Sequence, residues 1–255
     1  MAYTTIDDPS EYFHTRLYTG TGSSQAVTNN ANAGNFKPDW LWIKCRSDAA
    51  SHKIFDSSRL DGSGNPQMVI QSNSTSAEND VGNADFTSID ANGFTVLGAN
   101  ATGASSRTYV AWQWKANGGT TSSNSNGSIT STVQANTTAG FSIVTYVSNN
   151  TEGATFGHGL SSAPDLVIVK GRDSADNWAV FNGTSTTNSR SFHLDTTDAE
   201  IPVSSYNFWN LYWDETRPSS TVVTLGVDAK VNKSGNENFV AYCFHSVQGY
   251  SKIGK

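Results

Sequence analysis

The densest group of aromatic and charged side chains in the sequence lies between residues 206 and 217. Sugar rings stack their C–H faces on aromatic side chains, while carboxylates, amides and guanidinium groups bind the hydroxyls. We therefore interpret this stretch as a patch that binds a glycan or another receptor. Its predicted ligand-binding residues are Trp209, Tyr212, Trp213, Asp214 and Arg217. The alternative is that these rings fill the core or pack against a neighbouring subunit.

Carboxylates are also close together in the stretch 193–200, which contains Asp195, Asp198 and Glu200. A glycoside hydrolase needs two carboxylates that face one cleft, about 5–5.5 Å or 6.5–9.5 Å apart. A similar stretch at 71–78 ends in the same Ala-Glu pair but lacks both aspartates. A feature that the two stretches share favours a structural role, with a metal or glycan contact as the alternative. We assign no catalytic residue here.

Other reactive side chains have no spacing that indicates catalysis. The five histidines do not form a metal-binding pattern such as His-Glu-x-x-His, and Gly-x-Ser-x-Gly is absent. Asp56, Asp61 and Asn65 carry the oxygen ligands that Ca²⁺ prefers, but not in the order of an EF-hand loop. The sequence therefore predicts a protein that is not an enzyme and that needs no metal and no cofactor.

Charge and hydropathy limit the partners. The net charge is −6 and no Lys/Arg cluster exists, which argues against nucleic-acid binding because phosphate contacts need a basic face. No run of about 18 apolar residues exists, so we expect no membrane insertion. The first residues lack the basic and apolar regions of a signal peptide, which predicts folding in a cytoplasm. Cys45 and Cys243 occupy non-equivalent positions, and we expect two free thiols.

The elements that position these residues come from a duplication. Residues 38–46 read Pro-Asp-Trp-Leu-Trp-Ile-Lys-Cys-Arg, and residues 164–172 read Pro-Asp-Leu-Val-Ile-Val-Lys-Gly-Arg. A second pair, Thr-Tyr-Val-Ala-Trp-Gln-Trp-Lys at 108–115 and Asn-Phe-Val-Ala-Tyr-Cys-Phe-His at 238–245, follows in the same order. A tandem duplication of a whole domain is typical of modular binding and structural proteins, whereas an enzyme of this size more often has one unduplicated core.

Each half has the pattern of short strands. Trp40, Trp42 and Lys44 alternate with Leu41, Ile43 and Cys45, and the runs 109–114 and 239–244 show the same period of two, with Gly-rich turns separating the runs. Low charge and much Gly, Ser, Thr and Asn agree with this. We predict an all-β protein of two tandem antiparallel β-sandwich domains of the jelly-roll type. The boundaries are 1–116 for the first repeat with its short leader, 117–128 for a Gly/Ser/Asn linker, 129–248 for the second repeat and 249–255 for the start of a third repeat.

A Lys-x-Arg sequence ends the first strand of both conserved segments. Its recurrence predicts structural ion pairs with acidic residues that also recur. The residues concerned are Lys44, Arg46, Lys170 and Arg172, with Asp39 and Asp165 or Glu78 and Glu200 as the acidic partners.

Several strings resemble one family. They are Lys-Pro-Asp-Trp-Leu-Trp-Ile-Lys-Cys-Arg-Ser, His-Lys-Ile-Phe-Asp-Ser at 52–57, Asn-Gly-Phe-Thr-Val-Leu-Gly at 92–98, Tyr-Val-Ala-Trp-Gln-Trp-Lys at 109–115, Phe-Gly-His-Gly-Leu at 156–160, Asp-Asn-Trp-Ala-Val-Phe at 176–181 and Phe-Val-Ala-Tyr-Cys-Phe at 239–244. Together they resemble the repeated modules of phage virion proteins, especially tail-fibre-like proteins of marine tailed phages. Related phage modules are similar to concanavalin-like jelly rolls, which agrees with the strand pattern.

The resemblance implies a structural component of the virion, assembled in the host cytoplasm. We expect a tail fibre or appendage that contributes to attachment to the host surface. Its implied partners are further copies of itself, with a homotrimer as the first expectation, other tail or capsid proteins, and a host surface glycan. The alternatives are a capsid-decorating or head-fibre protein, a polysaccharide-binding or depolymerising tailspike module, and a lectin module that acts alone.

Overall fold

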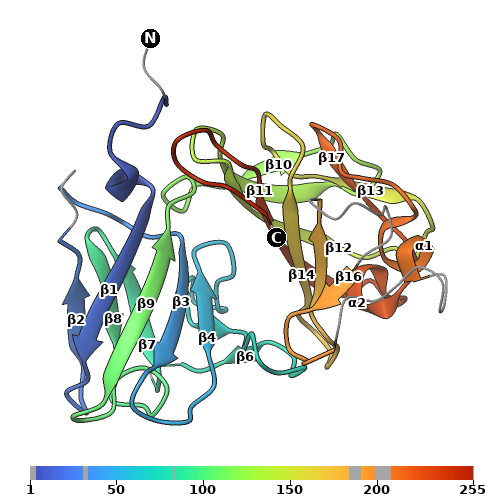
Figure 1. Cartoon of the computed structure of the whole chain (residues 1–255). Helices are drawn as coiled ribbons and strands as arrows, with labels where there is room; N and C mark the ends of the chain where they lie inside the picture. Colours follow the sequence, from blue (N-terminus) through green and yellow to red (C-terminus); the bar gives the residue numbers. More distant parts are fainter. Residues whose placement is uncertain (1–3, 31–33, 83, 184–190, 199–207, 255) are drawn as a thin grey trace. The chain divides into compact units, whose positions relative to one another are not determined.

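The computed structural model of the chain is all-β and built from antiparallel sheets, which confirms the predicted fold class (Figure 1). It describes residues 4–30, 34–82, 84–183, 191–198 and 208–254, with the backbone alone at 208–210. Two compact units form. The N-terminal unit comprises Asp7–Ser74 and Glu78–Gly119, and the C-terminal unit comprises Thr120–Lys255 together with Met1–Ile6 and Thr75–Ala77.

The N-terminal unit contains a four-stranded sheet of order β1-β9-β3-β4 and a three-stranded sheet of order β2-β8-β7. A buried cluster that includes Leu41, Phe55, Phe86, Phe94 and Tyr109 fills its core. The elements are η1 (Pro9–Glu11), β1 (Phe13–Thr19), β2 (Gln25–Thr28), β3 (Trp40–Cys45), β4 (Lys53–Asp56), β5 (Met68–Val69), β6 (Asn79–Asp80), β7 (Phe86–Asp90), β8 (Gly93–Val96) and β9 (Thr108–Trp114).

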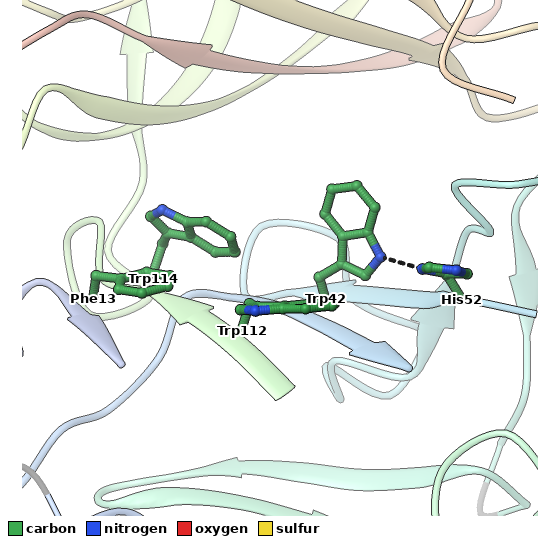
Figure 2. A pocket seen from close by; sticks show the side chains of 5 residues that line it. All are labelled: Phe13, Trp42, His52, Trp112 and Trp114. Carbon is green, nitrogen blue, oxygen red and sulfur yellow. Dashed lines mark hydrogen bonds between the residues drawn. The ribbon is translucent and has the colours of Figure 1, made fainter. Parts of the chain in front are cut away.

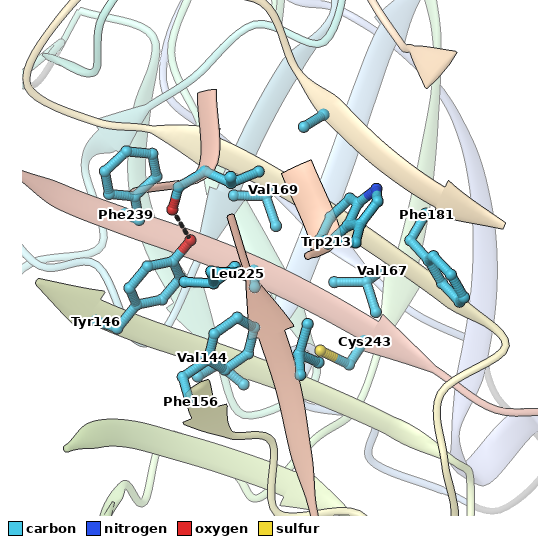
Figure 3. Packing of buried hydrophobic residues seen from close by; sticks show 14 of the residues in the cluster. Val144, Tyr146, Phe156, Val167, Val169, Phe181, Trp213, Leu225, Phe239 and Cys243 are labelled. Atoms are coloured by element: carbon cyan, nitrogen blue, oxygen red, sulfur yellow. Dashed lines mark hydrogen bonds between the residues drawn. The ribbon is translucent and has the colours of Figure 1, made fainter. Parts of the chain in front are cut away.

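The C-terminal unit contains a seven-stranded sheet of order β10-β11-β12-β18-β14-β15-β16 and the strand pair β13-β17. Its core is aromatic and aliphatic (Figure 3), and the Tyr146 hydroxyl inside it donates to the carbonyl oxygen of Val231 at 2.7 Å. The elements are β10 (Ser122–Asn124), β11 (Ser131–Asn136), β12 (Phe141–Val147), β13 (Ala154–Gly157), β14 (Leu166–Gly171), β15 (Ala179–Asn182), β16 (Ser191–His193), α1 (Phe208–Trp213), β17 (Val222–Leu225), α2 (Ala229–Asn232) and β18 (Asn238–Phe244).

The duplication extends to strand order and register. The order β1-β9-β3-β4 in the N-terminal unit recurs as β12-β18-β14-β15 in the C-terminal unit. Trp40 lies opposite Trp114 on β9, and Leu166, at the same position of the second repeat, lies opposite Phe244 on β18. The register fixes which side chains share a face of a sheet. Side chains at equivalent positions of the two repeats therefore project from equivalent faces of their own sheets.

The predicted linker 117–128 contains a strand. Within it, β10 pairs with β11, so that Ser123 lies opposite Thr132 at the end of the seven-stranded sheet. Short runs of Ser and Thr fit such an edge because one of their faces remains in water. At the other end of the chain, the predicted opening of a third repeat forms a turn, in which the N–H of Val247 donates to the carbonyl of Ser251 at 3.0 Å.

The acidic residue Glu78 has a partner that the repeat did not predict. Arg59 lies between two carboxylates, with Nε 2.6 Å from Asp56 and Nη1 2.6 Å from Glu78. The side chains of Arg59 and Asp56 are fully buried. Lys44 instead donates to the carbonyl oxygen of Ala50 at 2.6 Å. This buried ion-pair group holds the segment after β4 against the sheet, since Arg59 also donates to a β4 carbonyl at 3.3 Å.

Candidate functional site

The two central rings of the stretch 206–217 do not lie on the surface, where the predicted patch requires them. Tyr212 and Trp213 are 1% and 0% exposed and belong to the core of the C-terminal unit. The Trp213 indole N–H donates to Ser191 Oγ at 2.7 Å, and its ring meets Phe181 edge-on at 5.8 Å. The Tyr212 hydroxyl lies 3.1 Å from His193 Nε2. Neither ring can offer a face to a ligand, so the prediction is wrong for both.

Of the remaining predicted residues, the structure describes the side chains of Asp214 and Arg217. Arg217 is exposed, and its Nη1 donates to the carbonyl oxygen of Gly183 at 2.7 Å. Asp214 follows α1 in a left-handed conformation with φ 46°. The side chain of Trp209 lies outside the described residues. Residues 209, 212 and 213 are spaced i, i+3 and i+4, which is the spacing of one helix face and could have indicated a core helix.

The carboxylates near residue 195 also have structural partners. Asp195 accepts the backbone N–H of Trp178 at 3.0 Å and the side-chain amide of Asn177 at 3.1 Å. Asp198 is exposed, and Glu200 lies outside the described residues. In the described ranges, no group of three or more His, Cys, Asp or Glu side chains is placed to hold a metal ion.

The structure gathers a different set of rings, on the outer face of the four-stranded sheet of the N-terminal unit. Figure 2 shows five side chains there, which line a cavity of about 310 Å³. All five are partly exposed. We call this surface the aromatic face, and its residues are Phe13, Trp42, His52, Trp112 and Trp114.

Strand alternation and register build the aromatic face. Trp42 on β3 lies directly opposite Trp112 on β9, and Phe13 on β1 lies opposite Trp114. Because residues directly opposite each other share one face of a sheet, all four rings project to the same side. The ring centroids are 4.8 Å apart for Phe13 and Trp114 and 6.2 Å apart for Trp42 and Trp112. Trp40 also lies opposite Trp114 and so projects to this same side, but it is only 2% exposed, and its ring centroid is 4.5 Å from that of Trp114.

A hydrogen bond orients the ring of Trp42. Its indole N–H donates to Nδ1 of His52 at 3.0 Å, as the dashed line in Figure 2 shows. The acceptor must be unprotonated, and the protein favours that form: burial first, and then the charge of Lys44, lower the pKa of His52. The backbone N–H of His52 in turn donates to Asn73 Oδ1 at 3.0 Å. The imidazole is thus a fixed support for the indole.

The tryptophans of the aromatic face are confined to the first repeat. The second repeat has Ile168 at the position of Trp42 and Tyr242 at the position of Trp112, and it pairs these two residues in the same register. Both are buried, with exposed fractions of 7% and 0%. The sequence carried a signal for this face, namely two Trp-x-Trp runs on strands expected in one sheet. We interpreted these runs only as strands.

Comparison with known proteins identifies the family. The chain belongs to the family described as Domain of unknown function (DUF7483), which matches residues 8–255 and so spans both repeats. No curated protein and no solved structure matches the chain. Within the described residues, no helix is long and apolar enough to cross a membrane.

Proposed function

We propose that the chain is a non-enzymatic structural component of a tailed-phage virion, in a tail fibre or appendage, and that its N-terminal unit binds a host surface glycan. The observation that carries the binding role is the aromatic face. The assignment to a virion rests on the resemblance of the repeated strings to phage modules. A non-covalent adhesive role also suits a duplicated β-sandwich, because such scaffolds present side chains from rigid strands.

Stacking is the chemistry that the aromatic face supplies. A pyranose ring has a face of C–H groups, and the π-electron faces of Trp42, Trp112 and Trp114 attract such polarised hydrogens while excluding water. Adjacent strands are about 4.8 Å apart, so the rings on β1, β9 and β3, together with His52 just before β4, extend over roughly 14 Å. A surface of that length suits several linked sugar units better than one. The expected ligand is therefore an oligosaccharide segment of a longer polymer.

The lining side chains favour neutral sugars and binding without cleavage. None of the five carries a carboxylate or a fixed positive charge. Hydrolysis of a glycosidic bond needs a pair of carboxylates across the bond, and charged sugars need counter-charges to offset their desolvation. These requirements favour an adhesive module over the depolymerising tailspike alternative.

The test is binding of purified host surface polysaccharides to the full chain, measured by biolayer interferometry. Trp112→Ala removes one stacking ring and should weaken binding about 5- to 150-fold, since stacking on one aromatic ring contributes roughly 1–3 kcal/mol. Tyr250→Ala removes a ring from the C-terminal unit and should leave binding unchanged. Equal binding by Trp112→Ala, with its circular dichroism spectrum intact, would rule out the aromatic face as the site.

Two further measurements separate the alternatives. Release of reducing ends from a bound polysaccharide would establish a depolymerase and contradict the non-enzymatic role. Cryo-electron microscopy of the intact particle should place the chain in a tail appendage. Density on the capsid surface would instead make the chain a decoration or head-fibre protein.

A further inference from the structure

Strand β1 has an open edge. It ends the four-stranded sheet, and β9 is the strand that pairs with it in the described part of the chain. The backbone groups of even-numbered residues face β9: Gly20 N–H donates to Arg107 at 2.8 Å, and the Tyr12 carbonyl accepts from Lys115 at 2.9 Å. In an antiparallel pair this direction alternates along the strand. The N–H and C=O groups of Phe13, Thr15, Leu17 and Thr19 therefore point away from β9, and among them the Thr19 carbonyl accepts from Gln25 Nε2 at 3.0 Å.

An apolar side chain lies in the middle of this edge. Leu17 is 55% exposed, the most exposed large hydrophobic residue among those whose exposure the structure describes. Edge strands of monomeric proteins are commonly protected by lysine, proline or a bulge, because their free backbone groups can pair with another chain. The strand Phe-His-Thr-Arg-Leu-Tyr-Thr has no lysine, no proline and no bulge in its pairing with β9. Its arginine, Arg16, donates from Nη1 to Asn30 at 3.2 Å.

The second repeat shows how this fold covers the same edge. There β12 corresponds to β1, and β11 pairs along its other side, with Thr132 opposite Thr145 and Gln134 opposite Ile143. Thr145 has the position of Leu17, because Thr145 lies opposite Val240 on β18 as Leu17 lies opposite Val110 on β9. The fold therefore accepts an antiparallel strand at this edge without rearrangement of the sheet.

We propose that β1 pairs with β1 of a second copy of this chain, antiparallel, about a two-fold axis at Leu17. This register places Leu17 against its own counterpart and opposes Thr15 to Thr19, two favourable kinds of cross-strand pair. It also opposes Arg16 to Tyr18. An axis one residue earlier would oppose two Arg16 side chains, and like charges directly opposite each other are destabilising. The outward direction of the Leu17 backbone groups supplies two mutual hydrogen bonds at the axis.

The assembly is a two-fold dimer rather than the trimer that the family resemblance implies. A two-fold axis perpendicular to a sheet keeps the same face of both halves on the same side. The joined sheet therefore presents two aromatic faces in one direction, and this consequence rests on the proposed function while the pairing does not. One strand pair buries less area than a stable interface needs, so the dimer should form at high protein concentration and dissociate on dilution.

Sedimentation velocity over a concentration series tests the pairing without any glycan. The wild-type chain should pass from monomer to dimer as concentration rises. Leu17→Lys should remain monomeric, because it removes the apolar contact and opposes two charges at the axis. Leu60→Lys is the matched control, since Leu60 is 47% exposed on the same unit and away from β1. It should dimerise as the wild type does.

A covalent trap keeps the test decisive if Leu17→Lys folds poorly. Residues at the two-fold axis of such a pair have Cα atoms about 5.5 Å apart, within the range that a disulfide spans. Leu17→Cys should therefore form a covalent dimer on oxidation, while Leu60→Cys should not. Cys45 and Cys243 are buried and do not compete. A wild-type chain that is monomeric at every concentration, or an oligomer that Leu17→Lys leaves intact and Leu17→Cys does not trap, would overturn the proposal.

Discussion

Replacement of Arg59 by leucine should destabilise the N-terminal unit more than any change of a surface charge. The guanidinium bridges Asp56 and Glu78 at 2.6 Å each, with the Arg59 and Asp56 side chains 0% exposed and that of Glu78 6% exposed. Arg59→Leu leaves two carboxylates in a buried site without their counter-charge. Removal of one member of a buried ion pair typically costs about 3–5 kcal/mol, which is a large share of the roughly 5–15 kcal/mol that stabilises a domain.

Two variants divide this loss into parts. Glu78→Gln keeps the shape and one hydrogen bond to Arg59, and the Asp56 pair persists, so it should cost about 1–2 kcal/mol. Arg107→Leu removes the ion pair between Arg107 and Asp48, whose side chains are 32% and 40% exposed. Such an exposed pair contributes at most about 1 kcal/mol.

Urea denaturation followed by tryptophan fluorescence gives the three free energies of unfolding. In a thermal scan, Arg59→Leu should lower the midpoint by at least roughly 12 °C, since each kcal/mol corresponds to about 4–8 °C in a domain of 60–100 residues. A loss for Arg59→Leu that equals the loss for Arg107→Leu would refute the reasoning. It would mean that water or a neighbouring donor replaces the guanidinium at little cost.

Three further outcomes follow from single contacts. The pKa of His52 in the folded protein is below that of an unfolded histidine, so the unfolded chain binds the proton first as the pH falls. The contribution of neutral His52 to the free energy of unfolding is therefore full above about pH 6.5 and declines below it. Protonation of His52 in acid should change the fluorescence of Trp42, because it removes the acceptor of the indole N–H. This change should be absent in His52→Asn, which keeps an acceptor but does not titrate, and its persistence in that variant would contradict the assigned hydrogen bond. Burial raises the pKa of Cys243 to about 12, so iodoacetamide at pH 8 should alkylate it in urea and not in the native protein, as mass spectrometry would show. A methyl group at Gly103 would collide with a backbone carbonyl oxygen, whereas Gly62 has open space, so Gly103→Ala should lower the unfolding midpoint in urea and Gly62→Ala should not.

The parts of the fold that the sequence predicts are those set by local periodicity. The repeat, the alternation in 40–45 and the all-β class all depend on neighbours in the chain, and the structure agrees with them. The partner of Glu78 was missed because Arg59 lies 19 residues away in the chain and outside the recurring Lys-x-Arg. Aromatic density near residue 210 was misinterpreted because exposed stacking rings and buried core rings have the same composition. The i, i+3 and i+4 spacing of the helix α1, which differs from the period of two in the surrounding strands, is what distinguishes buried rings from exposed ones here.

The exposure of the aromatic face could not be predicted from the sequence either. A Trp-x-Trp run predicts that two rings share one face of a strand, but it does not say whether that face meets the core or water. The pairing of Trp42 with Trp112 decides this, because Leu41 and Ala111 on the alternate positions belong to the buried cluster. Pairing is a long-range property and had to be seen in the structure.

The two repeats therefore share one scaffold and differ in what its surfaces offer. At the same positions of the same sheet order, the first repeat has Trp42 and Trp112, and the second has buried Ile168 and Tyr242. At the same edge, the first repeat exposes Leu17, and the second is covered by β11. Stability alone would not select tryptophans and an exposed leucine in one copy, because a buried isoleucine and a buried tyrosine satisfy the same fold in the other. These differences place both the proposed glycan contact and the proposed self-association in the N-terminal unit. Two weak stacking sites that face the same way would then bind a repeating polymer more tightly than either site alone, since the second contact forms at a high effective concentration.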